Sequence, residues 1–112
     1  SGDPARLRQL VTILIDNAIR HSPAGGEVRV AIRAADGQAT VSVVDQGPGI
    51  RPLDLPHVFD RFWRAPDAPD GGTGLGLAIA RWIADRHGGS VVAESPESGG
   101  ALFVVRLPQG VS

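Results

Sequence analysis

Three short motifs in this sequence carry residue types that could bind a nucleotide. In the first, Asn17, Arg20 and His21 share a sector about 100° wide on a segment of helical periodicity. The amide oxygen of Asn17 is a ligand that Mg²⁺ accepts beside water and phosphate oxygens, and Arg20 could reach the same phosphates. A polar flank that faces water would have the same composition, so this motif leaves both interpretations open.

The second motif is the sequence DQGPGI at residues 45–50. Asp45 ends an expected strand in which alternate valines face inward, so we expect its carboxylate to be buried and to need a hydrogen-bond donor. The exocyclic amine of adenine is such a donor, whereas guanine carries a carbonyl there. Gly47 and Gly49 would let the backbone approach a flat ring. An ordinary aspartate-glycine turn is the alternative.

The third motif is a glycine-rich loop, GTGLGL at residues 72–77, which opens directly into an expected helix. Such a loop presents backbone N–H groups to an anion, and the helix dipole adds to the attraction. Its spacing differs from the dinucleotide-binding fingerprint. All 11 basic residues are arginine, which excludes phosphate sites that depend on a lysine.

In this order and spacing the motifs resemble the asparagine box and the two glycine boxes of histidine-kinase-type ATPase domains. Residues 58–64, VFDRFWR, look like the F box of sensor kinases. The resemblance runs from about Arg6 to Pro108. It implies the α+β Bergerat fold, a two-layer sandwich with helices on one face of a mixed, mostly antiparallel sheet, in which ATP lies under a lid.

The resemblance also assigns roles to residues. Asn17 would bind Mg²⁺ and act with Arg20 in catalysis, Asp45 would read adenine, and Phe59 and Phe62 would anchor the lid. The residues placed around ATP are Asn17, Arg20, His21, Asp45, Gly47, Gly49, Ile50, Arg64, Gly72, Thr73, Gly74, Leu75, Gly76 and Leu77.

Two features depart from the family pattern. Ile13 stands where sensor kinases usually have asparagine and hydrolysing relatives have a glutamate. Because an aliphatic side chain takes no proton, we expect little intrinsic ATP hydrolysis and a looser magnesium site. The short lid at residues 65–71 contains Asp67 and Asp70 but no basic residue, so nucleotide affinity should be modest.

The elements that must position these motifs follow from periodicity and turn residues. A helix should begin at Asp3-Pro4, and a half-buried strand at 28–32 should form a hairpin with 40–44 across Asp36-Gly37. Residues 46–56 should be loop, a second helix should cover about 74–87, and strands should cover 90–94 and 102–107. The apolar faces expected on the helices are Leu7, Leu10, Val11, Leu14, Ile15, Ala18 and Ile19, then Leu75, Ala78, Ile79, Trp82 and Ile83.

Length and composition indicate one domain over residues 1–112, with Ser1-Gly2 as a possible tag remnant. The net charge of −1 and the absence of cysteine argue against nucleic-acid binding, direct membrane contact and thiolate metal sites. His57 and His87 lack the flanking residues of a phosphoacceptor, so that histidine should belong to a separate dimerisation domain.

The predicted function is therefore a cytoplasmic catalytic domain of a two-component sensor histidine kinase, a protein-histidine kinase that uses ATP and Mg²⁺. Its partners would be the dimerisation and histidine-phosphotransfer domain of a membrane-anchored parent and a downstream response regulator. An anti-sigma-factor-type serine/threonine kinase and a degenerate nucleotide-binding module are the alternatives.

Overall fold

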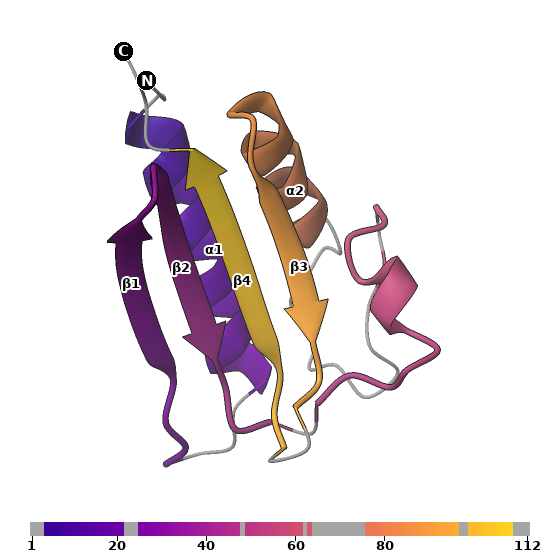
Figure 1. Ribbon diagram of the computed structural model, residues 1–112. Helices are drawn as coiled ribbons and strands as arrows, with labels where there is room; N and C mark the ends of the chain where they lie inside the picture. Colours follow the sequence, from indigo (N-terminus) through magenta and orange to yellow (C-terminus); the bar gives the residue numbers. More distant parts are fainter. Residues whose placement is uncertain are drawn as a thin grey trace.

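The chain folds into two layers, with both helices behind one face of a sheet (Figure 1). The computed structural model describes residues 4–21, 25–47, 49–61, 63, 76–96 and 99–108. Its elements are α1 (Pro4–His21), β1 (Arg29–Ala35), β2 (Gln38–Val44), the 3-10 turn η1 (Leu55–His57), α2 (Gly76–Arg86), β3 (Ser90–Glu94) and β4 (Leu102–Pro108). No helix in this part of the chain is both long and apolar enough to cross a bilayer.

The four strands form one sheet in the order β1-β2-β4-β3. All three pairings are antiparallel, so the expected α+β sandwich with a mostly antiparallel sheet is confirmed. The hairpin between β1 and β2 turns at Asp36 and Gly37, both with positive φ (55° and 77°). Two consecutive residues of positive φ match the right-handed twist of paired strands.

The core lies between the helices and the sheet. Spacings of three and four residues along each helix place one stripe against the strands. The buried residues at the centre of this layer are Leu10, Leu14 and Ala18 of α1, Ala80, Ile83 and Ala84 of α2, and Val43, Phe103 and Val105 of the strands. Part of the apolar face predicted for each helix is therefore confirmed.

The strand predicted at residues 28–32 is present as β1, but the predicted burial of one of its faces was wrong. All seven residues of β1 are exposed, including Val30 and Ile32. β1 is an edge strand, and α1 packs over β2 instead. Ile19, which was expected on the buried face of α1, is also exposed (59%).

The helix predicted over about 74–87 is present as α2, and its last turn ends as expected. Gly88 has φ 74°, the Gly89 N–H donates to the Ala84 carbonyl, and Nδ1 of His87 lies 2.8 Å from the Ile83 carbonyl. His87 is thus a capping residue, as predicted.

The apolar face predicted for this second helix was partly wrong. Ile79 (38%) and Trp82 (52%) are exposed, because the helix rests on the sheet through Ala80, Ile83 and Ala84. Residues 46–56 also contain the start of the short turn η1, which the glycine- and proline-rich sequence did not suggest.

Candidate functional site

A single carboxylate lies buried where β2 ends. Asp45 is 2% exposed, as the parity of its strand predicts. Its Oδ1 accepts hydrogen bonds from the backbone N–H groups of Gly47, at 2.9 Å, and Ala101, at 3.1 Å. Its Oδ2 is also buried, and no atom in the described part of the chain donates to it. Because a buried acceptor without a donor is costly, this oxygen fits an external N–H group.

The start of β4 holds this carboxylate in place. The backbone N–H of Asp45 donates to the Ala101 carbonyl at 3.0 Å. Gly100 has φ +76°, and a Cβ there would overlap the Asp45 carbonyl oxygen. Only glycine allows so close an approach. Sequence reasoning did not place Gly100 and Ala101 beside Asp45, because they lie more than 50 residues further along the chain.

The loop after Asp45 is fixed by a second contact from the same end of the sheet. Gly49 has φ +83°, and a Cβ there would lie 2.9 Å from Oγ of Ser95 and 3.0 Å from the Gly100 carbonyl. The Ile50 N–H donates to Ser95 Oγ at 3.1 Å, and Ile50 packs against the core. Sequence reasoning also missed Ser95, because its contact with Ile50 joins segments 45 residues apart.

The predicted residues of α1 lie on the side of this helix that faces the start of α2. Ile13 is half-buried, and its Cγ2 lies 3.5 Å from the Cβ position of Gly76. Asn17 is half-buried one turn further along the same flank, and Arg20 is exposed near the end of the helix. Leu77 packs against the core. The structure thus brings the Asn17 flank together with the end of the glycine-rich motif.

Several predicted site residues lie outside the described part of the chain. They are Arg64, Gly72, Thr73, Gly74, Leu75, the side chain of His21, and the proposed lid anchor Phe62. The other predicted anchor, Phe59, packs against the core, and its ring meets that of Phe103 edge-on with centroids 6.1 Å apart. The part of the F box that is described therefore contacts the sheet.

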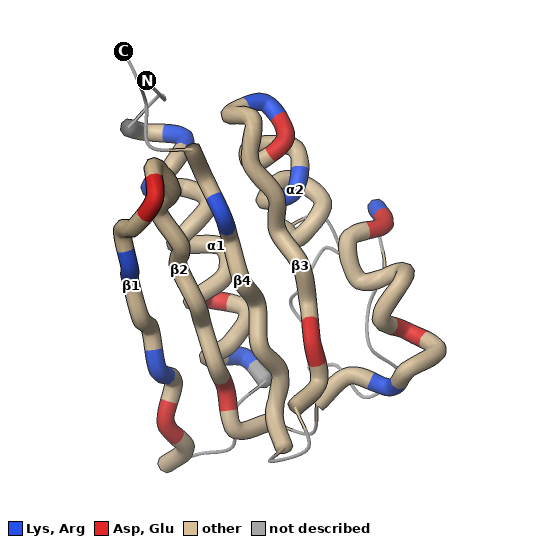
Figure 2. The backbone as a smooth tube through the Cα atoms, in the orientation of Figure 1, with Lys and Arg blue, Asp and Glu red and all other residues tan. Residues whose placement is uncertain are grey.

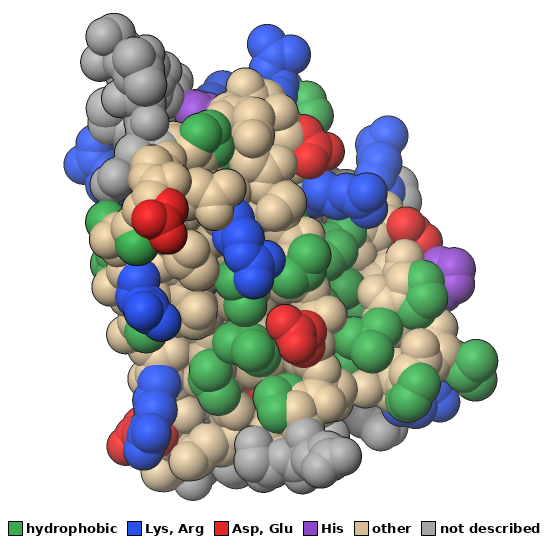
Figure 3. Space-filling model, in the orientation of Figure 1, with side chains coloured by type: hydrophobic (Ala, Val, Ile, Leu, Met, Phe, Trp, Pro, Cys, Tyr) green, Lys and Arg blue, Asp and Glu red, His purple; other side chains and the backbone are tan. Residues whose placement is uncertain are grey.

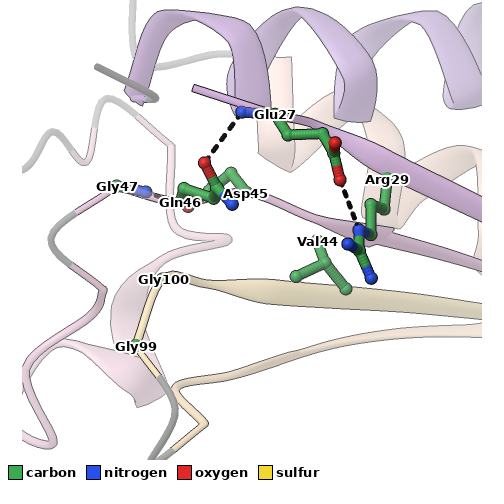
Figure 4. A pocket seen from close by; sticks show the side chains of 8 residues that line it. All are labelled: Glu27, Arg29, Val44, Asp45, Gln46, Gly47, Gly99 and Gly100. Carbon is green, nitrogen blue, oxygen red and sulfur yellow. Dashed lines mark hydrogen bonds and ion pairs between the residues drawn. The ribbon is translucent and has the colours of Figure 1, made fainter. Parts of the chain in front are cut away.

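A hollow of about 480 Å³ lies beside the Asp45 loop (Figure 4). Arg29 of β1 and Val44 of β2 line this hollow. By the alternation along their strands, their side chains point to the open face of the sheet, away from the helices. Its rim is tied by a hydrogen bond of 2.9 Å from the Glu27 N–H to Gln46 Oε1 and by the exposed Glu27–Arg29 ion pair. A hydrogen bond from Arg29 to Glu27 and the charge of Glu27 raise the pKa of Arg29. The hollow thus borders the Asp45 loop on the face of the sheet opposite the helices.

Comparison with known families identifies the chain. The model described as "Histidine kinase-, DNA gyrase B-, and HSP90-like ATPase" matches residues 2–111. The chain belongs to this family. The histidine-kinase-type ATPase domain accounts for the two-layer fold.

Several characterised relatives of the chain are sensor kinases. The domain is 46% identical to the signal transduction histidine-protein kinase AfsQ2 of Streptomyces coelicolor over 98% of this chain and 21% of that protein. It is 37% identical to a solved mycobacterial sensor histidine kinase, MprB (TM-score 0.88; 96% of this chain and 74% of that one). A full-length ShkA structure in complex with AMPPNP is 33% identical (TM-score 0.77; 92% and 21%).

This chain is therefore an ATP-binding catalytic domain of the sensor histidine kinase type, and the structure fits a nucleotide. The unsatisfied Oδ2 of Asp45 suits one N–H donor, which adenine has. The described residues contain no group of three or more acidic, histidine or cysteine side chains that could hold a metal.

Proposed function

We propose that this ATPase domain binds Mg-ATP and donates the γ-phosphate to a histidine on a separate dimerisation domain of its parent protein. The observation that carries the proposal is the buried Oδ2 of Asp45, which no described residue satisfies. The carboxylate's other oxygen is occupied by two backbone N–H groups. We infer that this unsatisfied oxygen accepts a hydrogen bond from a purine amine.

The proposed contact would select adenine over guanine. An amine at the six position of the purine donates to Oδ2, whereas the carbonyl of guanine would place two acceptors face to face. A ligand that leaves a buried polar group unpaired is rejected more strongly than one that loses a methyl contact. Gly49 and Gly100, at which side chains would collide with neighbouring groups, keep this part of the site compact.

We propose that Asn17, through magnesium, and Arg20, through its charge, stabilise the phosphates of ATP. Asn17 would supply an amide oxygen to magnesium, and bound magnesium would neutralise phosphate charge. Arg20, which is exposed at the end of α1, would add a mobile positive charge. The glycine-rich motif at residues 72–77 would contribute N–H groups at the start of α2. Phosphoryl transfer asks a protein mainly for this positioning and charge neutralisation.

The domain by itself should turn over ATP slowly. Ile13 packs against the core and beside Gly76, so the position from which hydrolysing relatives activate water holds an aliphatic group. The acceptor histidine and any base would come from the dimerisation domain. We further propose that the parent is anchored in a membrane, that this domain works in the cytoplasm, and that a response regulator receives the phosphate.

Phosphate transfer tests the proposal. The domain is incubated with γ-labelled ATP and the parent's dimerisation domain, and the label should appear on that domain in an acid-labile, base-stable form, as expected of phosphohistidine. Asp45→Asn should strongly reduce labelling at limiting ATP, while Asp36→Asn, the same change in an exposed turn, should not. Acid-stable label on serine or threonine would instead identify the anti-sigma-factor type of kinase.

A degenerate nucleotide-binding module is the second candidate, and the apolar surroundings of Ile13 favour it. Calorimetric titration with ATP separates the two. A catalytic domain should bind ATP more tightly with magnesium than without it, whereas weak binding that is independent of the metal would indicate a module that has lost its catalytic role.

A further inference from the structure

The open face of the sheet carries an apolar strip between two opposite charges. Val91 of β3 is paired with Val105 of β4, and both are buried in the core against the helices. The alternate residues of these two strands therefore point to the open face. Figure 3 views this face directly and shows apolar side chains gathered between basic and acidic ones. We call the residues concerned the β3–β4 strip: Ser90, Val92, Glu94, Leu102, Val104 and Arg106.

The two charges of the β3–β4 strip lie at its opposite ends. Arg106 is paired with Ser90, and Glu94 is paired with Leu102. Figure 2 shows the basic residue toward one end of β4 and the acidic residue toward the opposite end of β3. At about 3.3 Å per residue the two levels are about 13 Å apart, too far for an ion pair within the chain. Neither Arg106 nor Glu94 forms an ion pair with another described residue, so each charge is available to a partner.

This arrangement is complementary to itself. A second copy can be laid face to face, related by a two-fold axis that runs across the strands at the level of Val92 and Val104. Because the axis reverses each strand about this level, Val92 meets Val92 of the other copy. Arg106 then lies over Leu102 of the other copy, about 5 Å, or one strand, from its Glu94. The contact therefore contains two equivalent Arg106–Glu94 pairs, as in an isologous interface.

The charges also specify the orientation. A two-fold axis along the strands would instead place Arg106 over Ser90 of the other copy, beside that copy's own Arg106, and like charges would repel. The axis across the strands has one unfavourable feature, since it brings Arg33 of β1 over Arg29 of the other copy. The ion pair with Glu27 already compensates the charge of Arg29. Only the axis across the strands thus joins opposite charges along the strip.

We propose that two copies of this chain associate weakly through the β3–β4 strip. Of the apolar side chains in the strip only Val92 is exposed (37%), so the contact is small and stable dimers of the free domain are not expected. Its role in the parent rests on the proposed function, in which a dimerisation domain holds two copies together. Such a linkage gives a weak contact a high effective concentration.

Cross-linking through single cysteines tests the contact. The chain contains no cysteine, so an introduced thiol reports on one position only. Val92→Cys lies on the proposed axis, and since packed sheets lie about 10 Å apart, a bis-maleimide of that span should join two copies. Val30→Cys, at a similarly exposed valine (43%) on the other face of the sheet, is the matched control. Val92→Cys should give several-fold more cross-linked dimer at the same protein concentration. Equal yields would overturn the pairing of two copies.

Exchange of the two charges tests the orientation. Within the Val92→Cys variant, Arg106→Glu or Glu94→Arg alone should lower the yield several-fold, because each places like charges together. Both changes in one chain should restore the yield, which also shows that the single variants do not fail through misfolding. Single changes without effect, or a double variant that stays low, would refute the proposed pairs. Neither ATP nor an acceptor domain is present in this assay, so its failure is separate from a failure of phosphate transfer.

Discussion

Replacing Asp45 with asparagine alters the proposed adenine contact and little else. Oδ1 of Asp45 accepts two backbone N–H groups, from Gly47 and Ala101. The amide oxygen of asparagine can accept both. Its NH₂ group then stands where Oδ2 stood and points a donor at the amine of adenine. We therefore expect Asp45→Asn to fold normally and to lose ATP.

The size of the loss follows from the bond removed. A hydrogen bond to a carboxylate contributes about 1.5–3 kcal/mol, and an unpaired buried donor costs a similar amount. At about 1.4 kcal/mol for each factor of ten, loss of the bond alone weakens ATP binding about 10- to 150-fold. The free energy of unfolding without nucleotide should change by less than about 1 kcal/mol, because both backbone donors keep an acceptor.

Asp45→Ala provides the contrast. It removes the acceptor of both backbone N–H groups, so it should lose ATP binding and also lower the free energy of unfolding by about 1–3 kcal/mol or more. Titration with a fluorescent ATP analogue measures the first effect and denaturant unfolding the second. Asp36→Asn, in the exposed hairpin turn, is the control. If Asp45→Asn bound ATP within about twofold of the unaltered domain, the adenine contact would be refuted.

Three further changes test neighbouring parts of the site. Gly100→Ala should destabilise the domain by more than Gly99→Ala. Both residues have positive φ, and the backbone strain alone costs about 1–3 kcal/mol, but only at Gly100 would the added Cβ clash with Asp45. Equal melting temperatures of the two variants would contradict the close packing. Ser95→Ala should cost about 0.5–1.5 kcal/mol, since the Ile50 N–H loses its acceptor; an unchanged unfolding midpoint would show that water replaces it. Arg20→Gln should weaken the binding of ATP about tenfold and leave the binding of adenosine unchanged. Arg8→Gln, a change at another exposed arginine of α1, should alter neither affinity. An equal loss of affinity for both ligands would place Arg20 away from the phosphates.

The sequence predicted the elements well where local signals were strong. The predicted bounds of β3 (Ser90–Glu94) agree with the structure, and Asp36-Gly37 correctly identified the hairpin turn. The parity of β2 also predicted the burial of Asp45. In each case a feature within a few residues determines the backbone: positive φ at a turn, or alternation along a strand.

The errors concern which apolar residues are covered. Periodicity correctly put Leu10, Leu14 and Ala18 on one face, but the same pattern included Ile19, and alternation included Ile32. Periodicity shows that one face of a helix or strand is apolar. Whether that face is buried depends on how far the neighbouring layer of helices or strands extends. The contacts of Ser95 and Ala101 could not be predicted for a related reason, because each joins segments that are 45 or more residues apart in the sequence.

The central claim is that Asp45 and Asn17 serve one nucleotide, and a crystal structure of the domain with magnesium and a non-hydrolysable ATP analogue tests it most directly. We expect Oδ2 of Asp45 within hydrogen-bonding distance of the adenine amine and the amide oxygen of Asn17 among the magnesium ligands. An adenine ring bound elsewhere, or a magnesium ion that Asn17 does not contact, would contradict the account.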